Sequence, residues 1–467
     1  MQKTVLSFVL IFIISFALHS QNTTITGNAL GAEDLKIKLI TFSDYISELT
    51  EKLDETTIDS LGNFKLKTSI NECIFAQIQI DIYKGEIYLE PGKSYSIKIS
   101  PLNFKDDNKI SPFLNKKKLE ITFNTLDTNE LNQKISRFNI LFDDFIINNF
   151  KTIRNRNKSK IDSFQVIINN IFPTSKNSFL NTYIKYSIAV MEQIGRTKNV
   201  QKFYSSYIMN QSILYNNKEY MSFFNQFYEK FFFTGKHSLN TNDLKQLIAD
   251  KNYISLLDSL GRDTMVKNEV IRELVFLKGM KELYYTQAYD NDNIIIMLSK
   301  FSGKTKFKEH KLIAKNLIIS FNKLKIGNKP PDFKLKNTKN EAFTLASFEG
   351  KYTYIGFFTT WCAGCMTENE SIAELKKKFG DKVNFVSISA DKQPLNLYYY
   401  LEKHKYDWHF LYADVEMLEK YEVLTYPVFM LLDPSGNIIN FPALKPSENI
   451  ENEFLFLLNK VKIESKE

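Results

Sequence analysis

Two cysteines three residues apart, at a point where a strand pattern changes to a helix pattern, constrain this chain more than any other feature. The apolar run from Tyr352 to Phe358 predicts a buried strand, and the segment after the cysteines has apolar residues at the spacing of one helix face. These apolar helix positions are Ile372, Leu375 and Phe379. Cys362 and Cys365 are therefore expected in a turn that leads from a strand into the start of a helix.

That position has chemical consequences for the two thiols. The first N–H groups of a helix lack partners within the helix, and its dipole places positive charge at this end, so a thiolate is favoured over a thiol. We expect Cys362, the outer residue, to be the nucleophile with the lowered pKa. Cys365 is expected one turn further in, within reach of a mixed disulfide on Cys362, which it can resolve. The two residues are thus predicted to form a redox-active disulfide.

The residues around the dithiol resemble the thioredoxin superfamily and, within it, the TlpA/ResA/DsbE group of periplasmic thiol–disulfide oxidoreductases. The resemblance covers the C-terminal part of the chain and is more specific than a bare C-x-x-C. The matching segments are Pro331–Phe333, Gly350–Lys351, Phe357–Cys365, Glu368, Tyr426–Pro427 and Asp433–Gly436. It implies that Pro427 is a cis-proline facing the dithiol and that Glu368 relays protons to the thiols, both as catalytic residues.

Two positions depart from the pattern of that group. Tyr426 stands before the proline, where a small or β-branched residue is usual, and Glu370 replaces a proline common in the first helix. The chemistry of the dithiol does not depend on either position, but the choice of substrate does. We expect Trp361 and Tyr426 to contact the substrate, which lies as an added strand beside Tyr426–Pro427.

Three other interpretations of the dithiol have weaker support. A zinc site needs two further ligands, and His404 and His409 lack the spacing of a ligand pair, so no metal and no other cofactor is expected. A permanent structural disulfide is disfavoured, because links of this length at a helix start are strained and easily reduced. A thiol peroxidase would use Thr359 and Cys362 as T-x-x-C, but Ile355 occupies the place of the proline upstream.

The dipeptide Ala363–Gly364 between the cysteines contains no histidine, the residue with which strong oxidants of this superfamily stabilise the thiolate. The sequence therefore favours a disulfide reductase acting on disulfide-bearing exported proteins. In an oxidising compartment a membrane thiol reductase would have to supply electrons, a partner that the resemblance implies. The alternative from another class is an envelope binding or assembly module with a minor or vestigial redox site.

The first 20 residues predict export. Lys3 is followed by an apolar run from Val5 to Leu18 and then by small residues, the pattern of a signal peptide, which indicates the periplasm or cell envelope. An uncleaved segment acting as an N-terminal anchor is the alternative. The chain has only 3 cysteines, so no framework of structural disulfides is expected, and Cys73 is predicted to be a buried, inert thiol.

The length of 467 residues predicts several domains, and a net charge of +8 over that length gives no nucleic-acid footprint. Residues 22–101 alternate apolar and polar side chains between turn signals, which predicts an antiparallel β-sandwich.

From 120 to 322 the apolar period becomes helical, as in Leu131, Ile135 and Phe138, which predicts an all-α middle domain. A linker at 323–331 then leads to a thioredoxin-like α/β domain at 332–463, with the element order β-α-β-α-β-β-α and a last helix capped by Ser447.

Overall fold

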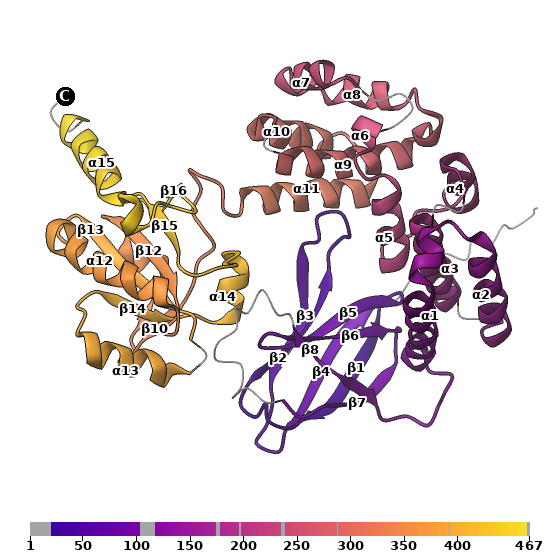
Figure 1. Ribbon diagram of the computed structural model, residues 1–467, viewed down its shortest axis with the longest axis horizontal. Helices are drawn as coiled ribbons and strands as arrows, with labels where there is room; N and C mark the ends of the chain where they lie inside the picture. Colours follow the sequence, from indigo (N-terminus) through magenta and orange to yellow (C-terminus); the bar gives the residue numbers. More distant parts are fainter. Residues whose placement is uncertain are drawn as a thin grey trace, which may run out of the picture.

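The computed structural model describes residues 20–102, 117–173, 178–195, 198–234, 239–286, 288–391 and 393–464 (Figure 1). The predicted signal peptide, residues 1–20, therefore lies outside the described residues except for its last position. None of the described helices has the length and hydrophobicity needed to cross a lipid bilayer.

The N-terminal region consists of strands arranged in two sheets. The strands are β1 (Gln21–Ala29), β2 (Lys36–Phe42), β3 (Thr50–Thr57), β4 (Asn63–Ile70), β5 (Ile74–Ile80), β6 (Tyr83–Leu89), β7 (Ser94–Ile99), β8 (Lys117–Lys118) and β9 (Ile121–Phe123). Within the described residues their orders are β4-β1-β7-β9 and β3-β2-β5-β6-β8. Alternate side chains such as Ile25, Leu39 and Ile97 enter one shared core, as the period-two pattern requires.

Two features of these sheets differ from the prediction. The pairs β1–β7 and β6–β8 are parallel, so the expectation of purely antiparallel strands is wrong for them. Alternation of side chains identifies a strand but does not set the direction of its neighbour. Strands also continue past residue 101 to Phe123, because β8 and β9 are too short for the alternation to be read.

Helices occupy the next region, up to Asn322. They are α1 (Leu131–Arg154), α2 (Lys158–Ile171), α3 (Ser178–Ile194), α4 (Val200–Tyr207), α5 (Lys218–Phe227), α6 (Phe231–Thr234), α7 (Thr241–Ala249), α8 (Tyr253–Leu260), the 3₁₀ helix η2 (Thr264–Val266), α9 (Glu269–Thr286), α10 (Asn291–Ser302) and α11 (Lys308–Asn322). The stripe that predicted α1 is buried at Leu131, Ile135 and Phe138. It packs with Phe75 and Tyr88 of β5 and β6, so this end of the helical region lies on the N-terminal sheet (Figure 1).

Asparagine side chains determine where several of these helices begin. Asn157, Asn199, Asn217, Asn240 and Asn252 each accept a hydrogen bond from a backbone N–H in the first turn of the following helix. Such a bond satisfies one of the donors that a helix start leaves without a partner and contributes about 1 kcal/mol.

The C-terminal region is a thioredoxin-like α/β domain. Its elements are β10 (Leu335–Asn337), β11 (Ala342–Phe343), η3 (Leu345–Phe348), β12 (Tyr352–Phe358), α12 (Ala363–Phe379), β13 (Val383–Ser389), α13 (Pro394–His404), β14 (His409–Tyr412), α14 (Val415–Lys420), β15 (Val428–Leu432), β16 (Ile438–Asn440), η4 (Pro446–Glu448) and α15 (Ile450–Glu464). The described strands form one sheet in the order β11-β10-β14-β13-β12-β15-β16. β12 is therefore central, parallel to β13 and antiparallel to β15.

Opposite faces of β12 are covered by different helices. Tyr354 packs with α12 and α15, and Phe358 packs with α12 and α13, whereas Ile355 and Phe357 pack with α14. The predicted element order omitted β14 and α14. Their lengths, 4 and 6 residues, are too short for a clear hydrophobic period.

Helix α14, which the sequence did not predict, contacts the strands of the N-terminal region. Lys84 of β6 forms an ion pair with Glu419 at 2.8 Å, and Lys38 of β2 pairs with Glu416. The side chain of Val415 packs against the core of the N-terminal sheets. Lys38 and then Lys420 lower the pKa of Glu416 to about 2. In Figure 1, α14 accordingly lies on the side of the C-terminal domain that faces the N-terminal strands.

Candidate active site

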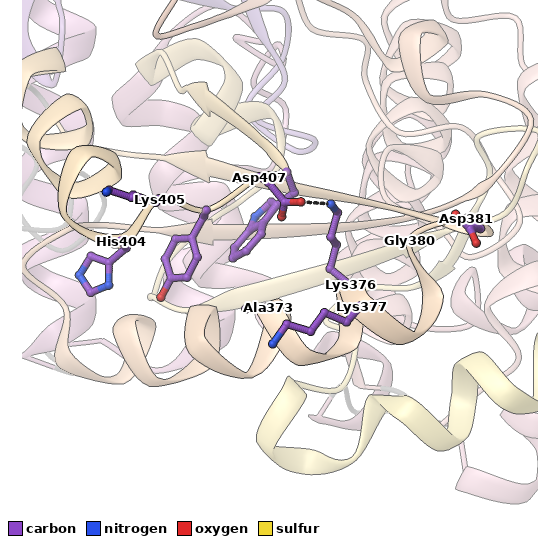
Figure 2. A pocket seen from close by; sticks show the side chains of 10 residues that line it. Ala373, Lys376, Lys377, Gly380, Asp381, His404, Lys405 and Asp407 are labelled. Carbon is purple, nitrogen blue, oxygen red and sulfur yellow. Dashed lines mark hydrogen bonds and ion pairs between the residues drawn. The ribbon is translucent and has the colours of Figure 1, made fainter.

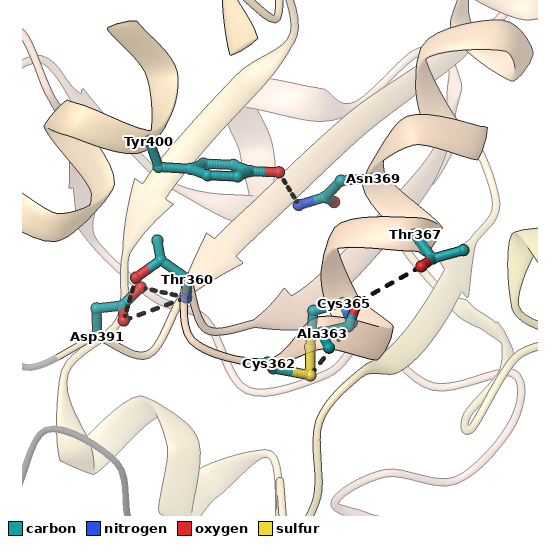
Figure 3. Close-up of a disulfide and its surroundings, with 8 residues drawn as sticks. All are labelled: Thr360, Cys362, Ala363, Cys365, Thr367, Asn369, Asp391 and Tyr400. Carbon is teal, nitrogen blue, oxygen red and sulfur yellow. Dashed lines mark hydrogen bonds between the residues drawn. A yellow bond between two sulfur atoms is a disulfide. The ribbon is translucent and has the colours of Figure 1, made fainter. Parts of the chain in front are cut away.

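Cys362 and Cys365 form a disulfide at the start of α12, with their Cα atoms 5.2 Å apart (Figure 3). Cys362 is the N-cap residue of this helix, and its Sγ accepts a hydrogen bond from the Cys365 N–H at 3.2 Å. Cys362 is half-buried, whereas Cys365 is only 1% exposed. An incoming sulfur can therefore reach Cys362 but not Cys365.

The turn before the dithiol is held by hydrogen bonds to the neighbouring strand. The Cys362 N–H donates to the Thr359 carbonyl at 3.2 Å, which closes a turn. Within that turn, the Thr360 N–H donates to the Asp391 carboxylate at 2.9 Å, and the Thr360 hydroxyl donates to it at 2.9 Å (Figure 3).

Sequence reasoning missed Asp391. It lies two residues after the end of β13, and β13 is parallel to β12, so the carboxyl ends of both strands meet at the same edge of the sheet. An acidic residue at that place was a usable signal.

Pro427 faces the dithiol turn from the loop before β15. The Tyr426–Pro427 peptide is cis, and a Cβ atom placed on Gly364 would lie 3.9 Å from Pro427 Cδ. Pro427 thus lies close enough to Gly364 that a side chain at that position would be in van der Waals contact with it.

Trp361 and Tyr426 stand next to each other at this edge. Their rings meet edge to face with centroids 6.5 Å apart, and Trp361 is 39% exposed. The Tyr426 hydroxyl is buried and has no hydrogen-bond partner among the described residues. Burial, and then the charge of Asp391, raises the pKa of Tyr426. The structure therefore brings Trp361 and Tyr426 together beside the dithiol.

Glu368 lies on α12 one turn after Cys365 and is 6% exposed. Its carboxylate accepts the Ser447 N–H at 3.0 Å and the Ser447 hydroxyl at 2.6 Å. Within the described chain, none of its hydrogen bonds reaches a sulfur. The expectation that Ser447 caps the last helix is wrong, because Ser447 lies in η4 and α15 begins only at Ile450. The hydroxyl holds Glu368 instead.

The remaining surroundings of the dithiol are apolar. Cys365 packs with Phe358, Leu397, Tyr400 and Phe410. Nowhere in the described parts of the chain do three His, Cys, Asp or Glu side chains gather in a way that could hold a metal ion. Cys73 is a free, partly buried thiol, and burial raises its pKa.

A cavity of about 610 Å³ lies along the C-terminal half of α12, away from the dithiol (Figure 2). Its lining includes Lys376 and Asp407, which form an ion pair across it, and the ring of Trp408. Neither cysteine lines this cavity. The dithiol lies instead in the turn before α12, where Trp361, Ala363 and Gly364 are exposed.

Comparison with known proteins points to the same part of the chain. Residues 326–441 match the AhpC/TSA family. The thioredoxin-like protein YneN of Bacillus subtilis (strain 168) is 28% identical over 130 residues, which is 26% of this chain and 76% of that protein. The thiol-disulfide oxidoreductase ResA of Bacillus thuringiensis subsp. konkukian (strain 97-27) is 28% identical over 121 residues, 25% of this chain and 69% of that protein.

Among solved structures, the thioredoxin domain of a thiol-disulfide oxidoreductase from Bacteroides vulgatus is 23% identical, with a TM-score of 0.26. The match covers 28% of this chain and 98% of that one.

Proposed function

The C-terminal region of this chain belongs to the thioredoxin-like thiol–disulfide oxidoreductases of the TlpA/ResA type, and on that premise we propose that it reduces disulfides in exported proteins. The observation that carries the proposal is the half-exposed Sγ of Cys362 at the end of a helix, bonded to a buried partner sulfur. One reachable sulfur with one shielded resolving sulfur is the arrangement that disulfide exchange needs.

The proposed reaction has two exchange steps. The Cys362 thiolate attacks a substrate disulfide, forms a mixed disulfide and releases one substrate thiolate. The Cys365 thiolate then attacks the Cys362 sulfur, which releases the second substrate thiolate and leaves the Cys362–Cys365 disulfide. Two electrons pass to the substrate, and the form with the disulfide is the oxidised enzyme.

The neighbouring residues take supporting roles in this proposal. Glu368 accepts the proton that Cys365 loses before its attack, and Ser447 holds its carboxylate in place. Pro427 and Tyr426 offer a strand edge to the substrate chain, and Trp361 covers the mixed disulfide. The position of Pro427 beside Gly364 and the ring contact of Trp361 with Tyr426 support these roles.

Location and electron supply follow from the same proposal. Residues 1–20 act as a signal peptide, or as an N-terminal anchor if uncleaved, and bring the protein to the periplasm or cell envelope. A membrane thiol reductase returns the disulfide to the dithiol there. The β region at 22–101 and the helical region at 120–322 hold the thioredoxin-like domain at 332–463, beyond the linker at 323–331, against its protein substrates.

The test is reduction of insulin disulfides by the mature protein and by Cys362→Ser. We expect turnover by the natural sequence and only the uncatalysed rate with Cys362→Ser, while Cys73→Ser retains turnover. Cys365→Ser is expected to accumulate the mixed disulfide. Equal, negligible turnover by the natural protein and Cys362→Ser would refute the proposal. A midpoint potential above about −180 mV would identify an oxidant instead of a reductant.

A further inference from the structure

Asp391 is the buried charge that touches the turn in front of Cys362. It is 7% exposed, and both carboxylate oxygens accept hydrogen bonds: Oδ1 from the Thr360 hydroxyl, and Oδ2 from the Thr360 N–H and, at 2.7 Å, from the Ser389 hydroxyl. The Asp391 N–H donates to the same Ser389 hydroxyl at 3.2 Å. The carboxylate is therefore held rigidly at the end of β13.

Thr360 lies inside the turn, between Thr359, whose carbonyl accepts the hydrogen bond that closes the turn, and Trp361. Because the Cys362 N–H donates to the Thr359 carbonyl, fixing the Thr360 N–H and hydroxyl sets the direction in which the chain enters α12. The position of the Cys362 Sγ over the helix end depends on that direction. Figure 3 shows Asp391 bonded to Thr360, two residues before Cys362.

The charge of Asp391 also reaches across the site. It raises the pKa of Tyr426, after the larger effect of burial, and the ring of Tyr426 touches Trp361, the residue before Cys362. Asp391 bonds Thr360, two residues before Cys362, so its negative charge lies close enough to oppose the formation of a second negative charge on the Cys362 sulfur.

Other titratable groups also face the dithiol from the elements packed around it. These are Glu368 on α12, Tyr400 on α13, Tyr406 after α13, Tyr412 on β14 and Tyr426 before β15. Glu368 is bonded to Ser447, and the Tyr400 hydroxyl accepts a hydrogen bond from Asn369. In contrast to these groups, Asp391 hydrogen-bonds to the turn that carries Cys362.

We propose that Asp391 is a positioning residue that fixes the dithiol turn through Thr360 and, through its charge, makes the Cys362 thiolate less stable than the helix end alone would. Two opposing fields then act on one sulfur: the positive end of α12 and the Asp391 carboxylate. Because a thiolate that is stabilised less gives a less stable reduced form, the couple becomes more reducing. The inference deepens the proposed function and rests on Cys362 being the attacking thiol.

The test compares Asp391→Asn with the natural protein and with Asp407→Asn, which removes an exposed carboxylate of the same domain. Asparagine keeps an acceptor for Thr360 and removes the charge. We expect the pKa of Cys362, read from thiolate absorbance against pH, to fall by about half a unit, so that the thiolate fraction rises about threefold. The equilibrium constant with glutathione should shift about threefold toward the dithiol, about 14 mV at 29.6 mV per tenfold.

The two parts of the proposal are separated by a second variant. Thr360→Val keeps the Asp391 charge and removes one hydrogen bond to the turn, so it should shift the Cys362 pKa less than Asp391→Asn does and slow the reaction of Cys362 with a small aromatic disulfide about threefold. It also provides a test if Asp391→Asn does not fold.

Identical Cys362 pKa values and potentials in Asp391→Asn, Asp407→Asn and the natural protein would overturn the role of the charge. An unchanged reaction rate in Thr360→Val would overturn the positioning. These readouts use the dithiol without a protein substrate, so a failure to reduce insulin would refute the proposed function and leave this inference standing.

Discussion

The C-terminal domain and the helical region each bury a carboxylate in a chain of hydrogen bonds, but their surroundings differ. Asp391 lies under a turn that carries a half-exposed sulfur. Glu273 of α9 accepts from Thr305 at 2.6 Å and contacts His310 Nδ1 at 2.8 Å, and His310 Nε2 lies 2.8 Å from the Tyr215 hydroxyl. His310 has 0% exposure.

The comparison shows that a chain of acid, histidine and tyrosine does not by itself make an active site. Around His310 every ring nitrogen has a partner and no reactive atom meets solvent. Such a network contributes to stability and to a unique arrangement of the helices. At the dithiol the polar contacts orient an atom that a partner can reach, so the same kinds of bond serve reactivity. Variants of the helical network should change unfolding, and variants near the dithiol should change reaction rates.

The largest effect is expected at His310. In His310→Ala the buried Glu273 carboxylate loses its histidine partner, and removal of one member of a buried pair costs about 3–5 kcal/mol of unfolding free energy. Urea unfolding followed by circular dichroism measures this change, with the exposed neighbour Lys311→Ala as control. The dithiol potential should stay the same. If His310→Ala shifted the dithiol potential as much as Asp391→Asn does, the helical network would not be purely structural, and the contrast with the dithiol would be wrong.

A second acid, the partly buried Glu219 of α5, is expected to make the stability of the helical region depend on pH. It bonds the Tyr88 hydroxyl at 3.0 Å, and burial raises its pKa from 4.5 to about 7. Between these values the folded chain holds a proton that the unfolded chain has lost, so stability falls as pH rises and levels off above 7.

We expect a loss of about 3 kcal/mol across this window, at 1.36 kcal/mol per pKa unit. Urea unfolding at several pH values should show the slope in the natural protein and a flatter line in Glu219→Gln. Glu229→Gln, an exposed change in the segment after α5, should keep the natural slope. An equal slope in all three proteins would mean that Glu219 does not titrate in this range.

Substitution of Glu368, which lies near the dithiol on α12, is expected to change the reaction rate more than the stability. Glu368→Gln keeps the hydrogen bonds to Ser447 partly intact but removes the proton acceptor, and we expect insulin turnover to fall about tenfold, or about 1.4 kcal/mol. Ser447→Ala should have a smaller effect of the same sign, because the Ser447 N–H remains. Glu370→Gln, exposed on the same helix, is the control. If Glu368→Gln unfolds at lower urea concentration but keeps the natural turnover, Glu368 stabilises the fold and takes no part in the reaction.

The smallest effect is expected where the two ends of the chain meet. The Lys84–Glu419 pair is partly exposed, so a double-mutant cycle with alanine should give a coupling of at most about 1 kcal/mol that declines as salt is added. Unfolding of the natural protein, both single variants and the double variant in low and high salt measures it. A coupling that does not depend on salt would mean that α14 is held by packing at Val415 and not by charge.

The sequence predicted the long elements of the C-terminal region, but it did not predict several short elements or the direction in which the N-terminal strands pair. In the C-terminal region the strand before the cysteines and the helix after them could be predicted, because long periodic segments carry their own signal. The strands β8, β9 and β14 and the helix α14 were missed because 2 to 6 residues are too few for a period. Parallel pairing of β1 with β7 was missed because strand direction is decided between segments far apart in sequence.

The sequence by itself determined the reaction centre: two cysteines, a strand that ends just before them and a helix that begins at them are all local features of one segment. Only the tertiary structure decided which residues from distant parts of the sequence lie near the dithiol. Asp391 reaches it only because β13 lies beside β12, and Ser447 reaches Glu368 only because the chain before α15 returns to α12. Local sequence specifies backbone periodicity, whereas contacts between distant residues arise when the faces pack, and a single chain read alone carries no direct record of them.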